Sequence, residues 1–249
     1  MKNIKLYSII FILLFGLTAC QKQIFLADIE TRGYRIEKAS FPVDVKVATM
    51  IEPYKLKLDS TMNEVIAYCE EELVKGKPSS TLTNWFCDAL LDESQKLVTE
   101  PLDFAIQNYG GIRVPYLSKG DVTVGKVYEL MPFDNIMFIM ELKGSVVQEL
   151  FDKMAESGGW PVSRTIHFEI AYGKAKNIKI NGQMLDPGRI YNAAIPDYIA
   201  NGGDNMDFLK GGKVNNTGVL IRDLLISHLR YMKSIGQTIV PNNEQRIIE

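Results

Sequence analysis

Apolar residues recur with two periods along the chain, and the changes between them divide the sequence into predicted helices and strands. Spacings of three and four residues predict helices over residues 45–62, 79–97, 123–131, 145–157 and 217–236. Alternating or continuous apolar runs predict strands over residues 63–73, 102–108, 135–144 and 189–196. Two or three further strands are predicted between residues 165 and 185, where Gly173 and the Asn181-Gly182 pair are typical of tight turns.

This order of elements lacks the strict strand–helix–strand repeat of a parallel sheet. We therefore expect an α+β (mixed α/β) fold, with a single domain over residues 46–249 in which helices pack on a mixed sheet. The composition agrees, because 46% of the 249 residues are hydrophobic and 23% are charged, and such a chain can bury a sizeable core. Two details stay open: Pro53 either kinks the first helix or marks its start, and the last helix buries either His228 or Leu229.

The N-terminal residues have the pattern of a secretory signal peptide. Two lysines precede an apolar run over residues 9–17, and the sequence LTAC follows, ending at Cys20. LTAC resembles the lipobox of bacterial lipoproteins, which predicts a lipoprotein signal peptide over residues 1–20, lipidation of Cys20 and a tether over residues 21–45. The protein would then be a lipid-anchored membrane protein of the bacterial cell envelope, at the periplasmic face or the cell surface. An ordinary signal peptide or a first helix is the alternative interpretation.

Outside this segment the sequence offers little for catalysis. His167 and His228 are the only histidines, and neither has a second ligand at metal-binding spacing, so we expect no metal or other cofactor in this chain. The nucleophile, P-loop and dinucleotide motifs of common enzyme families are also missing from the sequence. The net charge of −2 does not favour nucleic acid as a partner. Cys69 and Cys87 are expected to be small buried residues, although a disulfide between them would be possible outside the cytoplasm.

Three loop segments, in contrast, combine glycine or proline with polar and aromatic side chains. They are NYGGIR at residues 108–113, MPFDN at residues 131–135 and YIANGGDNMDF at residues 198–208. Adjacent glycines allow the backbone to approach a ligand or to make a tight turn, and an arginine offers a forked donor for phosphate or carboxylate. Taken singly, each feature has an ordinary explanation, such as a turn, a buried phenylalanine or a surface ion pair.

Together, the three segments supply the groups that recognise a nucleoside. Two rings, those of Phe133 and Tyr198, could hold a base by stacking, which is worth about 1–3 kcal/mol per base. Asn135 could read the base edge. Asp204 could accept hydrogen bonds from ribose hydroxyls, and Arg113 could face a phosphate.

The same segments, in this order and at these separations, resemble the C-terminal domain of the 5′-nucleotidase family of bacteria and animals. The similarity extends to STLTNWFCDAL before them and to VNNTGVLIRDLLISHL after them, so that it covers residues 51–235. In full-length members of this family, an N-terminal metallophosphoesterase domain holds two metal ions and hydrolyses the substrate. The C-terminal domain binds the nucleoside and rotates to bring the phosphate to the metal ions.

The resemblance implies a substrate-binding role for residues in all three loops. It places the base between Phe133 and Tyr198, with Asn135 at the base edge. Asp204 would contact the ribose, and Arg113 the phosphate or the ribose. The other implied residues, which would contact the base or shape the glycine loops, are Asn108, Gly110, Gly111, Gly202 and Gly203.

Three departures from the family pattern qualify these roles. No Asp-x-His or GNH metal-binding pattern occurs, so we expect the metallophosphoesterase domain to be missing. Some members hold the substrate with arginines just before the helix predicted at residues 79–97, where this chain has Lys75 and Lys77. Tyr198 occupies a position where phenylalanine is usual.

The sequence is therefore interpreted as the nucleotide-recognition module of a split 5′-nucleotidase. It would position substrate for a separately encoded metallophosphoesterase, which would hold the metal ions, in nucleotide catabolism. The alternatives are a solitary nucleoside-binding lipoprotein, and an envelope scaffold that has kept the fold and lost the ligand.

Overall fold

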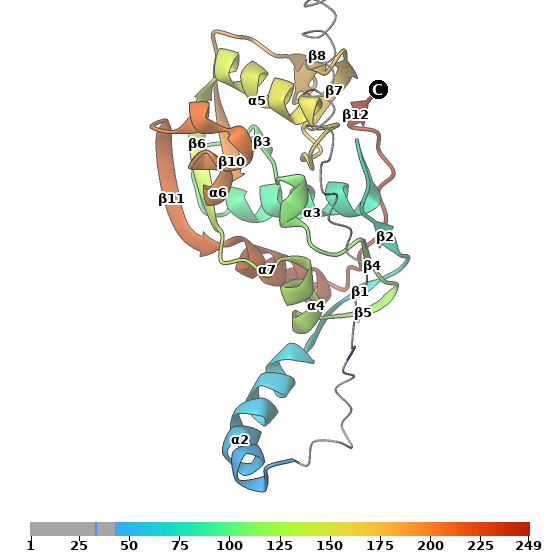
Figure 1. The fold of residues 1–249 in the computed structure, drawn as a ribbon. Coiled ribbons are helices and arrows are strands. Elements are labelled where there is room, and N and C mark those ends of the chain that lie inside the picture. Colours follow the sequence, from blue (N-terminus) through green and yellow to red (C-terminus); the bar gives the residue numbers. More distant parts are fainter. Residues whose placement is uncertain (1–32, 34–42) are drawn as a thin grey trace, which may run out of the picture. The chain divides into compact units, whose positions relative to one another are not determined.

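The computed structural model describes residue 33 and residues 43–249. The predicted signal peptide, the predicted lipidation site at Cys20 and most of the predicted tether lie outside the described residues. Within the described part of the chain, no helix combines the length and the apolar character needed to cross a membrane. Residues Ile51–Glu249 form one compact unit, whose elements are labelled in Figure 1.

The first described helix, α2 (Val45–Met62), has the predicted bounds and continues through Pro53. None of its residues is buried. At least half of the surface of Ile51, Tyr54 and Leu58 is exposed to solvent. The apolar spacing therefore predicted a helix here, although only its last residue, Met62, packs against the hydrophobic core of the described residues.

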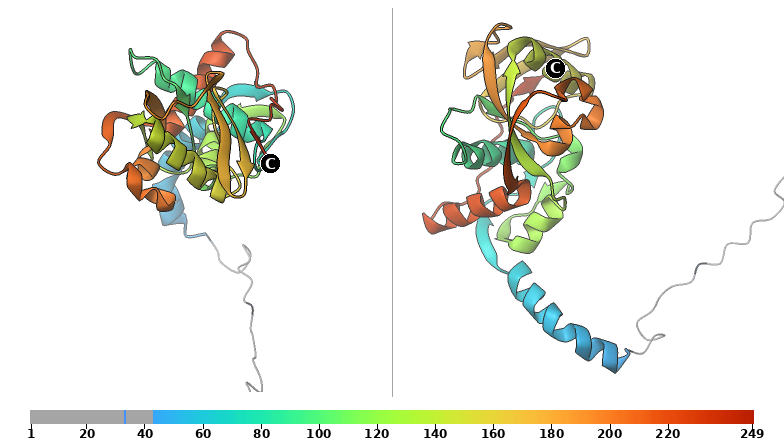
Figure 2. Two further views of the ribbon diagram at one scale, coloured as in Figure 1. Left: turned by 90° about the horizontal axis from the view of Figure 1, so that it is seen from above. Right: turned by 90° about the vertical axis from the view of Figure 1, so that its left-hand side faces the viewer.

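A four-stranded sheet in the order β11-β6-β10-β3 occupies the centre of the compact unit. Its strands are β3 (Phe104–Ala105), β6 (Ile136–Lys143), β10 (Ile190–Pro196) and β11 (Lys213–Leu220). Strand β6 is antiparallel to both β10 and β11, whereas β3 runs parallel to β10. Figure 2 shows this mixed sheet from two further directions, with β11 at its edge.

Both faces of this sheet are buried, because successive residues of a strand enter different hydrophobic clusters. Ile139 and Ala194 belong to a cluster with three helices, and Met140 and Ala193 belong to a cluster with two helices and a second sheet. The helices of the first cluster are α3 (Thr81–Gln95), α4 (Val124–Leu130) and α7 (Ile221–Ser234), and those of the second are α5 (Gly144–Glu156) and the short α6 (Asp197–Ala200). Burial on both faces explains the nearly continuous apolar run of β6.

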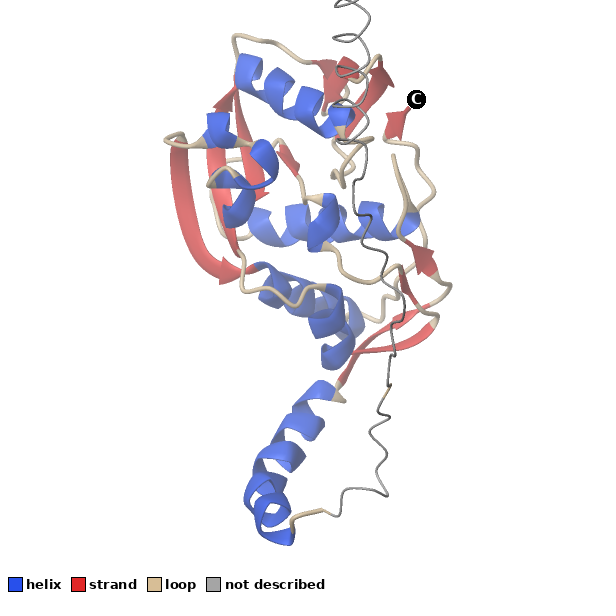
Figure 3. Cartoon of the chain, in the orientation of Figure 1, coloured by secondary structure: helices blue, strands red, loops and turns tan. Residues whose placement is uncertain are grey.

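The second sheet has the order β12-β7-β8-β9, and α5 packs on β8. Its strands are β7 (Ile166–Ala171), β8 (Lys174–Ile180), β9 (Gln183–Met184) and β12 (Ile247–Ile248). Two short antiparallel pairs complete the unit: β1 (Val65–Cys69) with β5 (Gly120–Thr123), and β2 (Leu73–Val74) with β4 (Tyr116–Leu117). Figure 3 shows these strands in red, with α3 and α7 side by side in blue.

A buried arginine holds the segment before β12 against α3. The side chain of Arg246 is fully buried, and its guanidinium donates to both carboxylate oxygens of Asp88 at 2.9 and 2.6 Å. It also donates to the carbonyl of Val162 and to the carboxylate of Glu244, each at 2.9 Å. This network joins three segments that are distant in the sequence.

The sequence predictions fail mainly where pairing partners are distant. Residues 217–220 were predicted as the start of the last helix but belong to β11, whose ladder with β6 ends at the pair Leu220 and Ile136. The predicted strand over residues 63–73 is interrupted between β1 and β2, and the short strands β4 and β5 follow the first loop segment where no strand was predicted.

Predictions that depend on local spacing agree better with the structure. Helix α7 buries Ile221, Leu224, Leu225 and Leu229, so Leu229 is the fully buried one of the two alternatives, while His228 is only largely buried. Cys69 and Cys87 are both buried and free, so the disulfide alternative is wrong and the expectation of small buried residues is confirmed.

Candidate functional site

The directions of three strands bring the three predicted loop segments to one edge of the central sheet. Strands β3 and β10 are parallel and both end at this edge, where the antiparallel strand β6 begins. The register places Ala105 opposite Ala194 and Met137 opposite Pro196. The loops after β3, before β6 and after β10 therefore converge, and such an edge is a common position for ligand sites.

These loops enclose a pocket of about 490 Å³. Eight of the ten predicted binding residues line it: Asn108, Gly110, Gly111, Arg113, Phe133, Asn135, Tyr198 and Asp204. Asp134, which the sequence analysis did not single out, also lines the pocket. Gly202 and Gly203 do not line it but belong to the turn that carries Asp204. The volume lies in the range of small-molecule sites.

The two predicted aromatic residues are accessible in this pocket. Phe133 is 39% exposed and Tyr198 is 46% exposed. The alternative that Phe133 belongs to the hydrophobic core is therefore wrong. The guanidinium of Arg113 lies 5.4 Å from the centroid of the Phe133 ring, within the range of a cation–π contact. Each ring is thus available to a flat ligand, and one of them has a positive charge beside it.

The carboxylate of Asp204 is held by two neighbours. Asn108 Nδ2 donates to one of its oxygens at 2.9 Å, and the Tyr198 hydroxyl donates to the other at 3.0 Å. This hydrogen bond to Asp204 raises the pKa of Tyr198, so the hydroxyl remains a donor. A carboxylate oxygen can accept more than one hydrogen bond, so Asp204 retains capacity for a ligand hydroxyl.

Close packing explains why glycine stands at two positions of these loops. A Cβ atom added to Gly203 would lie 2.5 Å from ring carbons of Tyr198 and 2.6 Å from its carbonyl oxygen. A Cβ atom added to Gly111 would overlap the side chains of Gln107 and Asn108. In both turns the missing side chain leaves room for a residue that lines the pocket or lies next to it.

The amide of Asn135 is oriented by a residue that the sequence analysis missed. Asn135 Nδ2 donates to Asp197 Oδ1 at 2.8 Å, and the same oxygen accepts the backbone N–H of Tyr198 at 2.7 Å. Asp197 begins α6 (Asp197–Ala200), directly after β10. Its position after a predicted strand was the available signal, but only the fold shows that it faces Asn135.

Positive charges gather around the short helix η2 (Tyr109–Gly111). Lys75 Nζ lies 4.0 Å from the centroid of the Tyr109 ring and donates to the carbonyl of Ile112, while Lys77 Nζ lies 4.8 Å from the same centroid. Burial lowers the pKa of Lys75, and the charges of Arg113 and Lys77 lower it further. In residues 43–249, none of these three cations forms an ion pair with a carboxylate.

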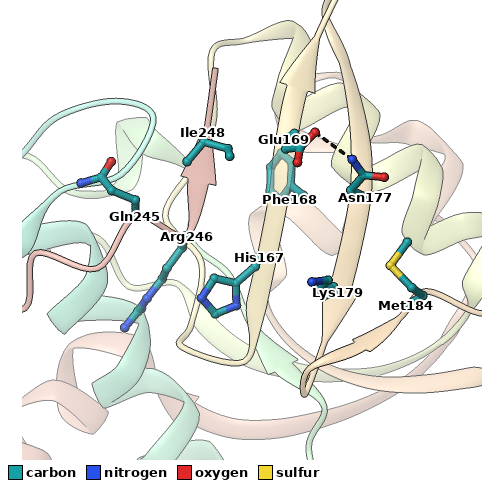
Figure 4. Close-up of a pocket in the computed structure, with 9 residues that line it drawn as sticks. All are labelled: His167, Phe168, Glu169, Asn177, Lys179, Met184, Gln245, Arg246 and Ile248. Carbon is teal, nitrogen blue, oxygen red and sulfur yellow. Dashed lines mark hydrogen bonds between the residues drawn. The ribbon is translucent and has the colours of Figure 1, made fainter.

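A second hollow, of about 440 Å³, lies on the second sheet and includes His167. Figure 4 shows its polar residues, among which Asn177 donates to Glu169 at 2.8 Å. His167 Nε2 is 3.0 Å from a carboxylate oxygen of Glu244, and Phe168 in its wall is only 3% exposed. Of the described residues, Phe168 is the one phenylalanine, tyrosine or tryptophan that lines this hollow, so the hollow offers no exposed ring of this kind on which a base could stack.

The other histidine is also accounted for by packing. His228 Nδ1 is 3.2 Å from a carboxylate oxygen of Glu93, and both side chains are largely buried between α7 and α3. Among the residues that the structure describes, no group of three or more histidine, cysteine or acidic side chains is arranged to hold a metal ion.

Comparisons with known proteins agree with this site. Residues 65–211 match the family described as "5'-nucleotidase, C-terminal domain". The chain is 32% identical to the 5'-nucleotidase of Vibrio vulnificus over 208 residues, which are 81% of this chain and 37% of that protein. It is 31% identical to protein UshA of Escherichia coli over 134 residues, which are 51% of this chain and 24% of that protein.

A solved structure gives the same result for the fold. The crystal structure of the 5'-nucleotidase precursor from Thermus thermophilus superposes with a TM-score of 0.67 and 25% identity, covering 84% of this chain and 44% of that one. The chain thus spans less than half the length of each of these proteins. Since the family match extends over more than half of the chain, the protein belongs to the family of 5′-nucleotidase C-terminal domains.

Proposed function

We propose that the chain is the nucleotide-recognition module of a 5′-nucleotidase, and that the pocket at the edge of the central sheet takes a nucleoside or nucleotide. The observation that carries this proposal is the convergence of two accessible rings, an amide, a carboxylate and an arginine on one pocket of about 490 Å³. The rings would stack on the base, Asn135 would bind its edge, and Asp204 would accept from the ribose hydroxyls.

The unpaired cations favour a phosphorylated ligand over a nucleoside. Arg113 lines the pocket, and Lys75 and Lys77 lie beside the same glycine loop. Positive charges that have no carboxylate partner in the described part of the chain attract an anion, and arginine and lysine are the usual phosphate-binding side chains. The two lysines would supply the charge that arginines supply in some family members.

Hydrolysis would be performed by a metallophosphoesterase unit outside the described residues, and we propose that this unit is a separately encoded protein. The metal ions would belong to that partner. The names of the curated relatives include 5′-nucleotidases and a "Trifunctional nucleotide phosphoesterase protein" of Bacillus subtilis. The module would hold the nucleotide so that its phosphate reaches the partner's metal site, and lipidation at Cys20 would keep it at the envelope membrane.

Calorimetric titration of the full chain with adenosine, AMP and inorganic phosphate tests the recognition step. AMP should bind more tightly than adenosine, and phosphate alone should bind weakly. Phe133→Ala should weaken adenosine binding by about tenfold, as expected for the loss of one stacking ring. Tyr231→Ala is the matched control, because its ring is 53% exposed on α7 and does not line the pocket. Equal affinities for wild type and Phe133→Ala would contradict the base-stacking role.

The Lys75→Met variant separates recognition of the phosphate from recognition of the base. It should weaken AMP binding while leaving adenosine binding unchanged, because the lysine adds charge near the glycine loop and does not line the pocket.

The catalytic partnership needs a separate experiment. Purification of the tagged full chain from its native membranes should recover a metallophosphoesterase, and the mixture should release phosphate from AMP faster than either protein alone. Nucleoside binding without such a partner would support the solitary binding protein instead. No nucleoside binding at all would support the scaffold.

A further inference from the structure

One buried arginine outside the pocket is bonded to the loop that carries Phe133. Arg222 lies at the start of α7, and its side chain is 8% exposed. Its guanidinium donates to the carbonyl oxygen of Phe133 at 3.2 Å and to Asp134 Oδ1 at 2.7 Å. The guanidinium carbon also lies 4.2 Å from the centroid of the Tyr128 ring. The arginine thus packs against Tyr128 of α4 and donates hydrogen bonds to two consecutive residues of the pocket.

The neighbouring residue on α7 holds the third residue of this loop. The backbone N–H of Ile221 donates to the carbonyl oxygen of Asn135 at 2.9 Å. The start of one helix is therefore bonded to residues 133, 134 and 135 in succession. These residues contribute a stacking ring and an amide to the pocket, so the geometry of the pocket depends on a helix that is distant in the sequence.

The bonds of Arg222 are a poor source of stability. Burying a guanidinium is costly, and its ion-pair partner Asp134 is 81% exposed, so water screens the attraction between them. In addition, Arg222 Nε is buried and has no hydrogen-bond partner in the part of the chain that the structure describes. A buried donor left unpaired costs free energy. The arrangement therefore fixes a geometry at some expense of stability.

We propose that Arg222 is a positioning residue, which holds the Phe133 ring in the orientation that base stacking requires. This proposal rests on the proposed function of the pocket. Without Arg222, the loop before β6 would keep the backbone bond at Asn135 but lose both bonds at Phe133 and Asp134. The ring would then sample several orientations, and the ligand would have to select one of them, which lowers the affinity.

Titration of adenosine into four forms of the full chain tests this role: wild type, Arg222→Met, Phe133→Ala and the double variant. Arg222→Met should weaken binding by about tenfold, since the effect of losing the orientation approaches that of losing the ring. In the Phe133→Ala background, the same change should weaken binding by less than about twofold, because an arginine that acts through the ring has nothing left to position.

Arg230→Met is the matched control. Arg230 lies on the same helix and pairs with Glu64 at 2.6 Å, and it does not line the pocket. Its replacement should leave the affinity unchanged. Arg222→Lys keeps the charge but not the forked donor, so it should fall between wild type and Arg222→Met.

Tyr128→Leu provides a second route if Arg222→Met does not fold. It removes the ring that packs against the guanidinium of Arg222, and it should weaken adenosine binding by about threefold. Unchanged affinity in Arg222→Met, or an equal loss with and without the Phe133 ring, would overturn the positioning role alone. Wild-type protein that does not bind adenosine would overturn the proposed function together with it.

Discussion

Replacing Gly203 by alanine should disturb the pocket without replacing any side chain that lines it. The added Cβ would lie 2.5 Å from two ring carbons of Tyr198 and 2.6 Å from its carbonyl oxygen. Ordinary contact begins at 3.4 Å, so the ring must move by close to an ångström or the turn must open. The backbone oxygen cannot rotate away as a side chain can, so part of the strain is unavoidable.

The size of this effect follows from the crowding. Overpacking of one methyl group costs about 1–3 kcal/mol, which should appear as a lower midpoint of urea unfolding. A shift of the Tyr198 ring would also break its hydrogen bond to Asp204, so adenosine should bind about tenfold more weakly, in line with the loss of one stacking ring.

Gly76→Ala is the matched control for this variant. Its Cβ would meet only Ser80 Cβ at 3.5 Å, which is ordinary contact, and its backbone is not in the left-handed region. Removing a glycine where the conformation permits it leaves stability unchanged or raises it slightly. A Gly203→Ala protein with the unfolding midpoint and the adenosine affinity of wild type would refute the close packing of Tyr198 against the glycine turn.

Three further predictions concern the pH dependence of stability, the buried Arg246 and the N-terminus. Burial lowers the pKa of His228 below its ordinary 6.5, against a smaller opposing effect of Glu93. The contribution of His228 to the free energy of unfolding should be complete above pH 6.5 and should be lost as the pH falls from 6.5 through the lowered pKa. His228→Gln should remove this part of the pH dependence of urea unfolding. Arg246→Met should lower the free energy of unfolding by about 3 kcal/mol, because it leaves Asp88 and Glu244 without their buried partner; a loss below about 1 kcal/mol in thermal or urea unfolding would show that water replaces the ion pairs. Cys20→Ala should abolish labelling of the protein by radioactive palmitate in bacteria and release it from the membrane fraction, and persistent labelling would contradict lipidation at this residue.

Local chemistry made much of the site predictable from the sequence. The glycine pairs, the proline before Phe133 and the glycine before Asp204 are adjacent in the chain to the residues that they present, so the turn geometry follows from short-range rules. Eight residues chosen from these segments, by their local chemistry and by the family resemblance, line one pocket. Their role in binding stays a prediction that the titrations test.

The missed features depend on pairing between distant segments. Strand β11 was not predicted at all, because most of its residues are exposed and it lacks the apolar–polar alternation that identifies a half-buried strand. Asp197 and Arg222 were missed for a related reason. Each acts on the loop before β6 across a sequence separation that no periodicity reports.

The pairing of β6 with its two neighbours gives ligand binding a second use, as a measure of correct strand alignment. Residue 135 directly precedes β6, whose first two residues pair with the ends of β11 and β10. A slip of one residue in either ladder would turn alternate side chains to the opposite face and move the Phe133 ring and the Asn135 amide away from the pocket. Circular dichroism would hardly detect such an error, because the strand content is the same. A refolded preparation with native spectra that fails to bind adenosine, when the native protein binds it, would reveal a misaligned sheet.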